Sequence, residues 1–463
     1  MPVLWFNIGD MKKFAALVFA SSILAIALCA CASSAIGPNE NLSGEVSDGR
    51  PVFQNEDLKK TYKNFEFSAK FKTSENGNAI IAFHTDEKFS KGYKIAIDNN
   101  PNSPNWWRAT GSLLGVRNIV KNFAKDGEWF ELKLKVSGAE ILVWIDGRLV
   151  VEYVEPQKPY RLPEFSSMKL SQGCVALRHT QGGKVEVKDI EIKELPDRSD
   201  VENQQANAID ETSDAAIKLH QADFPVLDFH VHLKDGFTAD WAFAKSRKIG
   251  INYSIAPNCG RDFPLNTGQK AQDYLDNLPE DFPFLSCMQA EGREWHILFG
   301  EAIRKQFAYA FTDAMTFNDL NGKRTHIWRD NEVNCPIGSE EKYMDLIVDT
   351  ICKLLADEPA DVYANPMRLP SILEKNSKKY WTPERRQKVL NALVKSGKAL
   401  EINMITRLPD ADFIKAAKAR GVKFTFGSNN KDSNFGRFEY AYEIIRECKL
   451  SSGDIYNPKK EKN

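Results

Sequence analysis

The chain has 463 residues, of which 42% are hydrophobic and 27% charged, and its formal net charge is −1. This composition is typical of globular proteins, and the length is sufficient for two or three domains. A net charge this close to zero gives no broad field that would favour nucleic acid or an acidic membrane surface. We therefore expect no nucleic-acid partner and infer partners from local sites.

The first 31 residues predict an export signal. Met11-Lys12-Lys13 is a short basic segment, and residues 14–28 form the apolar and small-residue stretch of a secretory signal. The following Leu28-Cys29-Ala30-Cys31 resembles the lipobox of bacterial lipoproteins, which implies that Cys31 becomes the acylated first residue. A plain N-terminal membrane anchor is the alternative. Both interpretations predict an exported protein of the cell envelope, attached to the outer or cytoplasmic membrane.

Residues 44–196 predict an all-β domain. Hydrophobic residues alternate with polar ones in several segments, including Phe65–Phe71, Phe130–Val136 and Val185–Ile192. Turn signals such as Asp146-Gly147 separate the segments. Many short strands with one polar face are typical of two packed antiparallel sheets, so we predict a jelly-roll β-sandwich.

Several motifs of this domain resemble the 3-keto-disaccharide hydrolase domain family. They include Asn76–Ile80, Gly92–Asp98, Asp146-Gly147-Arg148 and the closing segment Gly173–His179. The resemblance implies a concanavalin-like or laminin-G-like sandwich that acts on or binds sugars in a secreted bacterial protein.

The side chains of this domain that could contact a sugar are His84, Asp98, Trp106, Trp107, Arg108 and His179. Aromatic rings offer flat apolar faces to a pyranose, and carboxylates bind its hydroxyl groups. Core packing is the alternative for the two tryptophans. The sequence does not select the acid and base that a two-carboxylate hydrolase needs, so sugar binding without hydrolysis stays open for this domain.

Residues 197–223 predict a linker. Asp197–Asp200 and Glu202–Gln205 are polar and contain few large apolar residues, as a mobile connector does.

Residues 224–463 predict an α/β domain, because seven candidate strands alternate with helical patterns. The candidate strands are Pro225–His232, Ile251–Pro257, Phe282–Ala290, Phe307–Met315, Asp361–Asn365, Ala399–Met404 and Val422–Gly427. Seven such units predict a (β/α)7 TIM-like barrel, whose site lies at the carboxyl ends of the strands.

Polar residues stand at or just after all seven strand ends. They are His230, His232, Asn258, Arg261, Asp262, Glu291, Arg293, Glu294, Asp313, Asn365, Glu401, Asn403, Ser428, Asn429 and Asn430. A loop cap explains any one of them, whereas the complete set indicates a functional site. His230 and His232 are two residues apart on one strand, so their side chains point to the same face and could bind one divalent cation.

Four of these strand ends resemble the PHP family, named for polymerase and histidinol phosphatase. The motifs are His-x-His at 230–232, Gly-x-Glu at 292–294, Leu-Glu-Ile-Asn at 400–403 and Phe-Gly-Ser at 426–428. The resemblance implies a (β/α)7 barrel that hydrolyses phosphoesters with two or three metal ions. It also implies metal ligation by His230, His232 and Glu294, with Asp313 at a further ligand position.

The chain departs from the PHP pattern at two strand ends. The family has His-Pro after the fifth strand and Ser-Asp-x-His after the seventh, whereas this chain has Asn365-Pro366 and Ser428-Asn429-Asn430. Amides are weaker metal ligands than imidazole and carboxylate. We therefore predict a degenerate site that holds at most one or two Zn, Mn or Mg ions at reduced stoichiometry.

The remaining strand-end residues suggest roles in catalysis and substrate binding. The guanidinium groups of Arg261 and Arg293 suit a carboxylate, a phosphate or vicinal hydroxyls, with internal ion pairs as the alternative. If a metal polarises the substrate or a water, Glu401 or Asp313 is the expected proton acceptor. The amides predicted to contact substrate are Asn365, Asn403, Asn429 and Asn430.

Together these patterns predict an exported, lipid-anchored hydrolase or lyase that acts on glycosides or oxidised saccharides. The sandwich would engage the saccharide, and the barrel would carry a metal-assisted site. The alternative is a surface glycan-binding lipoprotein without catalytic activity, which the two amide departures favour. A phosphoesterase is disfavoured by the lost ligands.

Overall fold

The structure is a computed structural model, and it describes residues 44–45, 51–52, 59–234, 236–433 and 435–459. The predicted signal and its lipobox, with Cys31, lie outside these residues. Within the described ranges no helix is both long and apolar enough to cross a membrane.

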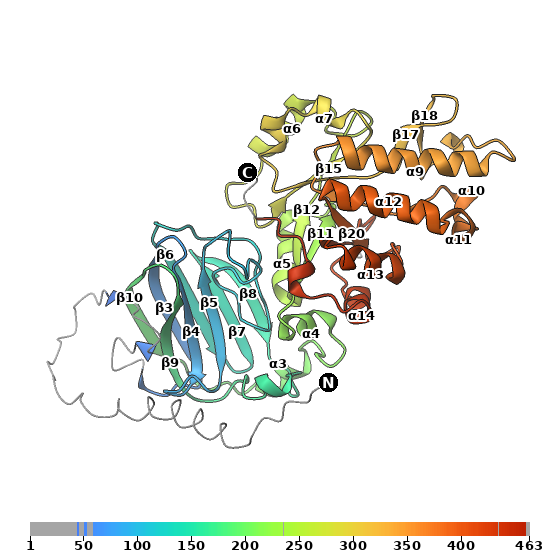
Figure 1. Ribbon diagram of the computed structural model, residues 1–463. Helices are drawn as coiled ribbons and strands as arrows, with labels where there is room; N and C mark the ends of the chain where they lie inside the picture. The colour runs from blue at the N-terminus through green and yellow to red at the C-terminus, as the bar shows by residue number, and fades with distance from the viewer. Residues whose placement is uncertain (1–43, 46–50, 53–58, 235, 434, 460–463) are drawn as a thin grey trace, which may run out of the picture. The chain divides into compact units, whose positions relative to one another are not determined.

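The N-terminal domain consists of two antiparallel sheets, drawn from blue to green in Figure 1. The six-stranded sheet has the order β1 (Gly44–Glu45), β10 (Val185–Glu194), β3 (Phe65–Thr73), β6 (Phe130–Ser137), β7 (Glu140–Ile145) and β8 (Arg148–Val154). The four-stranded sheet has the order β2 (Pro51–Val52), β9 (Cys174–Gln181), β4 (Asn78–Thr85) and β5 (Tyr93–Asp98). This arrangement fits the predicted β-sandwich.

The alternation seen in the sequence positions the core of this domain. In β3 the side chains of Phe65, Phe67, Ala69 and Phe71 are buried, and the residues that alternate with them are more exposed. Val175 and Leu177 of β9 belong to the same hydrophobic cluster. A strand of period two therefore gives each sheet one apolar inner face.

The segment predicted to be a linker is partly helical. It forms the helices α3 (Val201–Ala206) and α4 (Ala215–Gln221). Ile217 of α4 belongs to the core of the sandwich, and Leu219 belongs to the core of the second domain. The segment is polar on average, so its composition did not indicate these few buried side chains.

A buried carboxylate fixes the same segment. Glu211 is 1% exposed and lies 2.8 Å from Nη1 of Arg161, which is also buried. The hydroxyl of Tyr153 donates to Glu211 Oε1 at 2.6 Å, and the backbone N–H of Tyr160 donates to Oε2 at 2.8 Å. These contacts hold the connection between the domains against the sandwich.

The second domain contains two parallel sheets. The first has the order β11 (Leu227–Val231), β12 (Asn252–Ile255) and β14 (Leu285–Ser286). The second has the order β13 (Asn258–Cys259), β15 (Met288–Ala290), β16 (Ala310–Thr312), β19 (Val362–Tyr363), β20 (Ala399–Asn403) and β21 (Phe424–Gly427). A hairpin of β17 (Thr316–Asn318) and β18 (Arg324–His326) follows β16.

Helices connect these strands, as the sequence predicted. They are α5 (Ala239–Ile249), α6 (Gly268–Asp276), α7 (Trp295–Leu298), α8 (Glu301–Arg304), α9 (Glu340–Asp357), α10 (Ser371–Glu374), α11 (Ser377–Tyr380), α12 (Pro383–Ser396), α13 (Ala411–Ala419) and α14 (Glu439–Glu447). Local signals set their ends: the Thr382 side chain accepts from Arg385 N at the start of α12, and Gly397 ends it with φ 68°. A threonine cap and a left-handed glycine are favourable at these positions.

The parallel strands confirm the α/β class, but one closed seven-stranded barrel is not shown. The predicted strand Phe282–Ala290 is divided between the sheets as β14 and β15, and the strand predicted at Ile251–Pro257 is followed directly by β13 in the other sheet. The break between β12 and β13 falls at Ala256-Pro257, where proline has no N–H to donate to a neighbouring strand. The ends of β21 and β11 still meet, because Asn429 N donates to His230 O at 2.8 Å.

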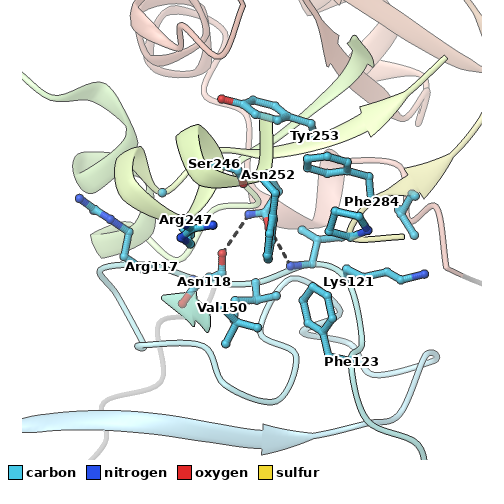
Figure 2. A pocket seen from close by; sticks show the side chains of 16 residues that line it. Arg117, Asn118, Lys121, Phe123, Val150, Ser246, Arg247, Asn252, Tyr253 and Phe284 are labelled. Atoms are coloured by element: carbon cyan, nitrogen blue, oxygen red, sulfur yellow. Dashed lines mark hydrogen bonds between the residues drawn. The ribbon is translucent and has the colours of Figure 1, made fainter. Parts of the chain in front are cut away.

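The loop between β5 and β6 packs against the second domain. Figure 2 shows Asn252 of β12 between two backbone groups of this loop: its Nδ2 donates to Asn118 O at 2.9 Å, and its Oδ1 accepts from Val120 N at 3.0 Å. In the same loop Arg117 donates to Lys248 O at 3.1 Å. Side chains from both domains therefore surround the small pocket in Figure 2.

Candidate functional site

The carboxyl ends of the parallel strands bring together the polar group that we call the strand-end cluster. Its members are His230, His232, Gln289, Glu291, Asp313, Asn365, Glu401, Asn403 and Asn429, all of them buried except Asn429, which is half-buried. Seven of the nine were predicted as site residues, so the sequence identified most of this cluster.

His230 and Glu401 form the closest pair in the cluster. Nδ1 of His230, at the end of β11, lies 2.6 Å from Oε2 of Glu401 on β20. Gly427 makes this approach possible, because a Cβ there would lie 2.7 Å from His230 Cβ and 2.8 Å from Glu401 Oε2. The two ring nitrogens of His230 thus both face oxygens, Nδ1 the carboxylate of Glu401 and Nε2 the amide oxygen of Gln289 at 3.2 Å.

The asparagines bridge the carboxylates of the cluster. Asn365 Nδ2 donates to Asp313 Oδ2 at 2.8 Å, and Asn403 Nδ2 donates to Glu401 Oε1 at 3.1 Å. Asn365 Oδ1 accepts from Asn429 Nδ2 at 2.8 Å. The amides at the two positions where the PHP pattern has other residues therefore act as neutral hydrogen-bond partners of carboxylates and of one another.

His232 is held mainly by backbone groups. Its Nδ1 lies 2.6 Å from the carbonyl oxygen of Ala256, and its backbone N–H donates to Asn430 Oδ1 at 2.7 Å. Asn430 Nδ2 returns a bond to His232 O at 2.9 Å, so this predicted substrate contact positions the histidine backbone instead. Burial, with the nearby His230 and Lys234, lowers the pKa of His232 well below its usual value.

Glu291 and Asp313 are buried carboxyl groups in the same cluster. Gln289 Nε2 donates to Glu291 Oε1 at 2.8 Å, while Glu291 Oε2 is buried without a hydrogen-bond partner. Burial and the charge of Asp313 raise the pKa of Glu291 well above its usual value. Glu291 was predicted at a strand end without a role, and Gln289 was not predicted because this residue is inside an apolar strand.

The predicted metal ligands do not converge. Glu294 lies 3.0 Å from Nη1 of Arg324, whose Nε contacts Asp262 at 2.6 Å. Arg324 belongs to the β17–β18 hairpin, which the sequence analysis did not anticipate, and it pairs with Glu294 in a group separate from the strand-end cluster. The assignment of Glu294 as a ligand beside His230 and His232 is therefore corrected.

The donor set does not fit a metal ion of the PHP type. Among the described residues, no group of three or more His, Cys, Asp or Glu side chains is placed to hold a metal. Both ring nitrogens of His230 already face protein oxygens, at 2.6 and 3.2 Å. The neutral amides of the cluster also supply less negative charge than a multinuclear centre requires.

The two predicted arginines differ in their surroundings. Arg293 forms an ion pair with Glu358 at 2.9 Å and donates to the backbone oxygen of Asp313. It therefore matches the alternative of an internal ion pair. Trp295 Nε1 also donates to Glu358, at 2.6 Å. Arg261 is exposed in its loop.

The predicted sugar contacts Trp106 and Trp107 are core residues, which corrects their assignment. Each is 4% exposed, and both belong to the hydrophobic core of the second domain. Trp106 packs against Phe229 with ring centroids 6.5 Å apart, and Trp107 Nε1 donates to Asp223 at 3.1 Å. Neither ring has a free face for a sugar.

Two other predicted contacts of the sandwich lie at its surface. Arg108 pairs with Asp223 and lines a cavity of about 330 Å³ together with Lys94 and Phe89. His179 Nε2 lies 2.8 Å from Gly183 O in the turn after β9. These positions leave Arg108 as a candidate for sugar binding and give His179 a local structural contact.

His84 and Asp98 are less available. His84 is buried between Lys63 O and Ser171 N, and burial lowers its pKa to about 4. Asp98 accepts from Asn100 N at 3.1 Å and from Ser103 Oγ at 2.8 Å.

Residues 41–193 match the family model of the 3-keto-alpha-glucoside-1,2-lyase-like domain. The sandwich is thus similar to the carbohydrate-related, hydrolase-like family that the sequence motifs indicated. No curated protein matches the chain.

Several solved structures each resemble less than half of the chain. A glycosyl hydrolase candidate from Parabacteroides distasonis has 20% identity over 30% of this chain and 74% of its own, with a TM-score of 0.27. The carbohydrate-binding module CBM66 from Bacillus subtilis has 12% identity over 33% and 96%, with a TM-score of 0.24. A histidinol phosphatase candidate from Listeria monocytogenes has 10% identity over 44% and 94%, with a TM-score of 0.32.

Proposed function

We propose that this protein is a saccharide-processing enzyme of the cell envelope, a hydrolase or lyase in which the sandwich engages the sugar and His230 transfers a proton. The observation that carries the proposal is the 2.6 Å contact between His230 Nδ1 and Glu401 Oε2 at the strand ends. The family match of the sandwich supports a saccharide as the substrate.

The chemistry assigned to the pair needs no bound metal. Glu401 fixes the ring of His230 through Nδ1, so Nε2 is the nitrogen that exchanges a proton with the substrate once its 3.2 Å contact with Gln289 Oε1 opens. In a 3-keto glucoside the proton on C2 is acidic because C3 is a ketone. As that proton passes to Nε2, the electron pair of the C2–H bond forms the C1–C2 double bond. The C1–O bond breaks, and the leaving glycosidic oxygen takes a proton from the imidazolium. In hydrolysis the same nitrogen would transfer a proton to or from the leaving group or the water.

Access to His230 requires movement of Asn429. This amide lies 3.2 Å from Nε2 of His232, donates to Asn365, and is the most exposed member of the strand-end cluster. We propose that the substrate displaces the side chain of Asn429. We also propose that the parallel sheets form a distorted (β/α)7 barrel that closes between β21 and β11.

The test compares p-nitrophenyl α-glucoside with its 3-keto derivative as substrates of the mature protein. We expect His230→Gln to reduce turnover by about 10²–10⁴-fold, the typical contribution of a proton-transfer residue. Glu401→Gln should reduce turnover and also shift the pH profile, because Glu401 acts through His230. His296→Gln, a histidine of α7 outside the cluster, is the matched control. Wild-type turnover by His230→Gln would refute the assignment.

A second function is favoured by the burial of the cluster. His230 is 1% exposed and both its ring nitrogens are occupied, as in a site that stabilises the fold without chemistry. The protein would then be a non-catalytic, surface glycan-binding lipoprotein. Glycan binding without turnover, unchanged in His230→Gln, would establish this function instead.

The proposals on metal and location have direct tests. Elemental analysis of the mature protein measures the predicted Zn, Mn or Mg ion, which reduced stoichiometry puts below about one per chain. Turnover of an aryl phosphate would point to a phosphoesterase. Mass spectrometry should find an acylated Cys31. An intact N-terminus at Met1 in membranes would contradict the lipid anchor.

A further inference from the structure

A cavity beside the sandwich brings together lysines from distant parts of the chain. It has a volume of about 370 Å³, and we call it the lysine cavity. Its lining residues are Asn99, Pro101, Lys121, Asn122, Ala124, Lys125, Asp126, Leu285 and Lys459. Lys121, Leu285 and Lys459 also line a neighbouring cavity of about 740 Å³, so the two cavities adjoin.

Lys121 and Lys459 are half-buried, and Asp98 is the carboxylate whose charge acts on Lys459. Lys459 Nζ donates to the neutral Asn122 Oδ1 at 2.5 Å. In the part of the chain that the structure describes, neither lysine forms an ion pair with a carboxylate. Burying a charge without a partner is unfavourable, so two such groups on one cavity indicate an anionic ligand.

The charges around Lys459 strengthen this interpretation. Burial and the nearby Lys121 lower its pKa, which the charge of Asp98 partly opposes, to about 7. Burial and Arg148 lower the pKa of Lys121. The other charged groups that line the two cavities are Lys125, Asp126, Glu280 and Lys305.

We infer that the lysine cavity binds the carboxylate of an acidic saccharide, with Lys121 and Lys459 as its cationic contacts. That the ligand is a saccharide rests on the proposed function, and that it carries a carboxylate is the new inference. Lysine ammonium groups act as point charges that suit a single carboxylate.

The neighbouring cavity fits the rest of such a ligand. Leu275, Leu278 and Phe307 are among its apolar lining residues, and Lys305 and Gln306 are among its polar ones. Apolar side chains can pack against the ring faces of sugar units next to the acidic one, while polar groups bind their hydroxyls. Lys121 and Lys459 line both cavities. We therefore expect the carboxylate at the middle of the bound saccharide, with sugar units on either side.

The test measures binding to the full mature protein by calorimetry. The probes are trisaccharides of galacturonate, mannuronate and glucuronate, each paired with its methyl ester, which removes the charge and keeps the ring. We expect at least one acid to bind roughly tenfold or more tightly than its ester. Lys121→Met and Lys459→Met should each remove most of that difference, and Lys353→Met, at an exposed position of α9, should not.

Proton uptake provides a second measurement that does not depend on the variants folding equally well. An anion favours the protonated form of Lys459, so binding near pH 7.5 should take up a fraction of a proton in wild type and less in Lys459→Gln. Equal binding of acids and esters would overturn the inference and leave the proposed function standing. Absence of binding by every acidic and neutral saccharide tested would overturn both.

Discussion

Replacing Glu211 by alanine should destabilise the protein strongly, because it removes the central carboxylate of a buried network. Glu211 is 1% exposed and accepts from Arg161 Nη1 at 2.8 Å, from Tyr153 OH at 2.6 Å and from Tyr160 N at 2.8 Å. The nearest remaining carboxylate for Arg161 is Glu155, at 3.8 Å. Removing one partner of a buried pair costs about 3–5 kcal/mol because the other charge stays buried.

Urea denaturation followed by tryptophan fluorescence measures this loss, since most of the signal should come from buried rings such as Trp106 and Trp107. Trypsin cleavage after Arg198 or Lys218 provides a local measurement, because the connecting segment should open in the variant. Asp200→Ala, which removes an exposed ion pair with Arg198 in the same segment, is the matched control and should leave both measurements unchanged. A loss below about 1 kcal/mol for Glu211→Ala, with unaltered cleavage, would refute the reasoning.

Three further outcomes are expected. Gly427→Ala should lower the free energy of unfolding by about 1–3 kcal/mol through overpacking and move the His230 imidazole resonances, and unchanged resonances would contradict the close approach. Trp106→Ala should cost about 3–5 kcal/mol in urea denaturation while the folded protein retains its sugar affinity, whereas a loss of affinity at unchanged stability would restore the sugar-contact interpretation. Affinity for the acidic trisaccharide should fall as pH rises through about 7, where Lys459 loses its proton, and the slope should vanish in Lys459→Met.

The sequence predicted those features that depend on short-range patterns. Alternation in Phe65–Phe71 specified both the strand and its buried face, since a period of two assigns each side chain to one side of a sheet. His230 and Glu401 meet although they are 171 positions apart, because β21 pairs with β20 and its end meets β11 through the bond from Asn429 N to His230 O.

The predictions that the structure changed have a different physical cause. They depend on contacts between segments far apart in the chain, which no short-range sequence pattern reveals. Glu294 was assigned to a metal because of its spacing from a strand, whereas its partner Arg324 comes from a later hairpin. The tryptophans at 106 and 107 looked suited to sugars, but their neighbours come from the other domain. The linker appeared mobile by composition, yet one buried Glu211 and a few apolar side chains were sufficient to order it.

The two buried tryptophans change where this protein can be divided. The boundary at residue 196 separates two kinds of secondary structure, but it leaves two indole rings of the first half in the core of the second. A fragment ending there would present both rings to water, and such a patch favours association with other chains. Separate production of the first half would therefore require substitution of both tryptophans. During synthesis the two rings become buried only after the second domain has folded.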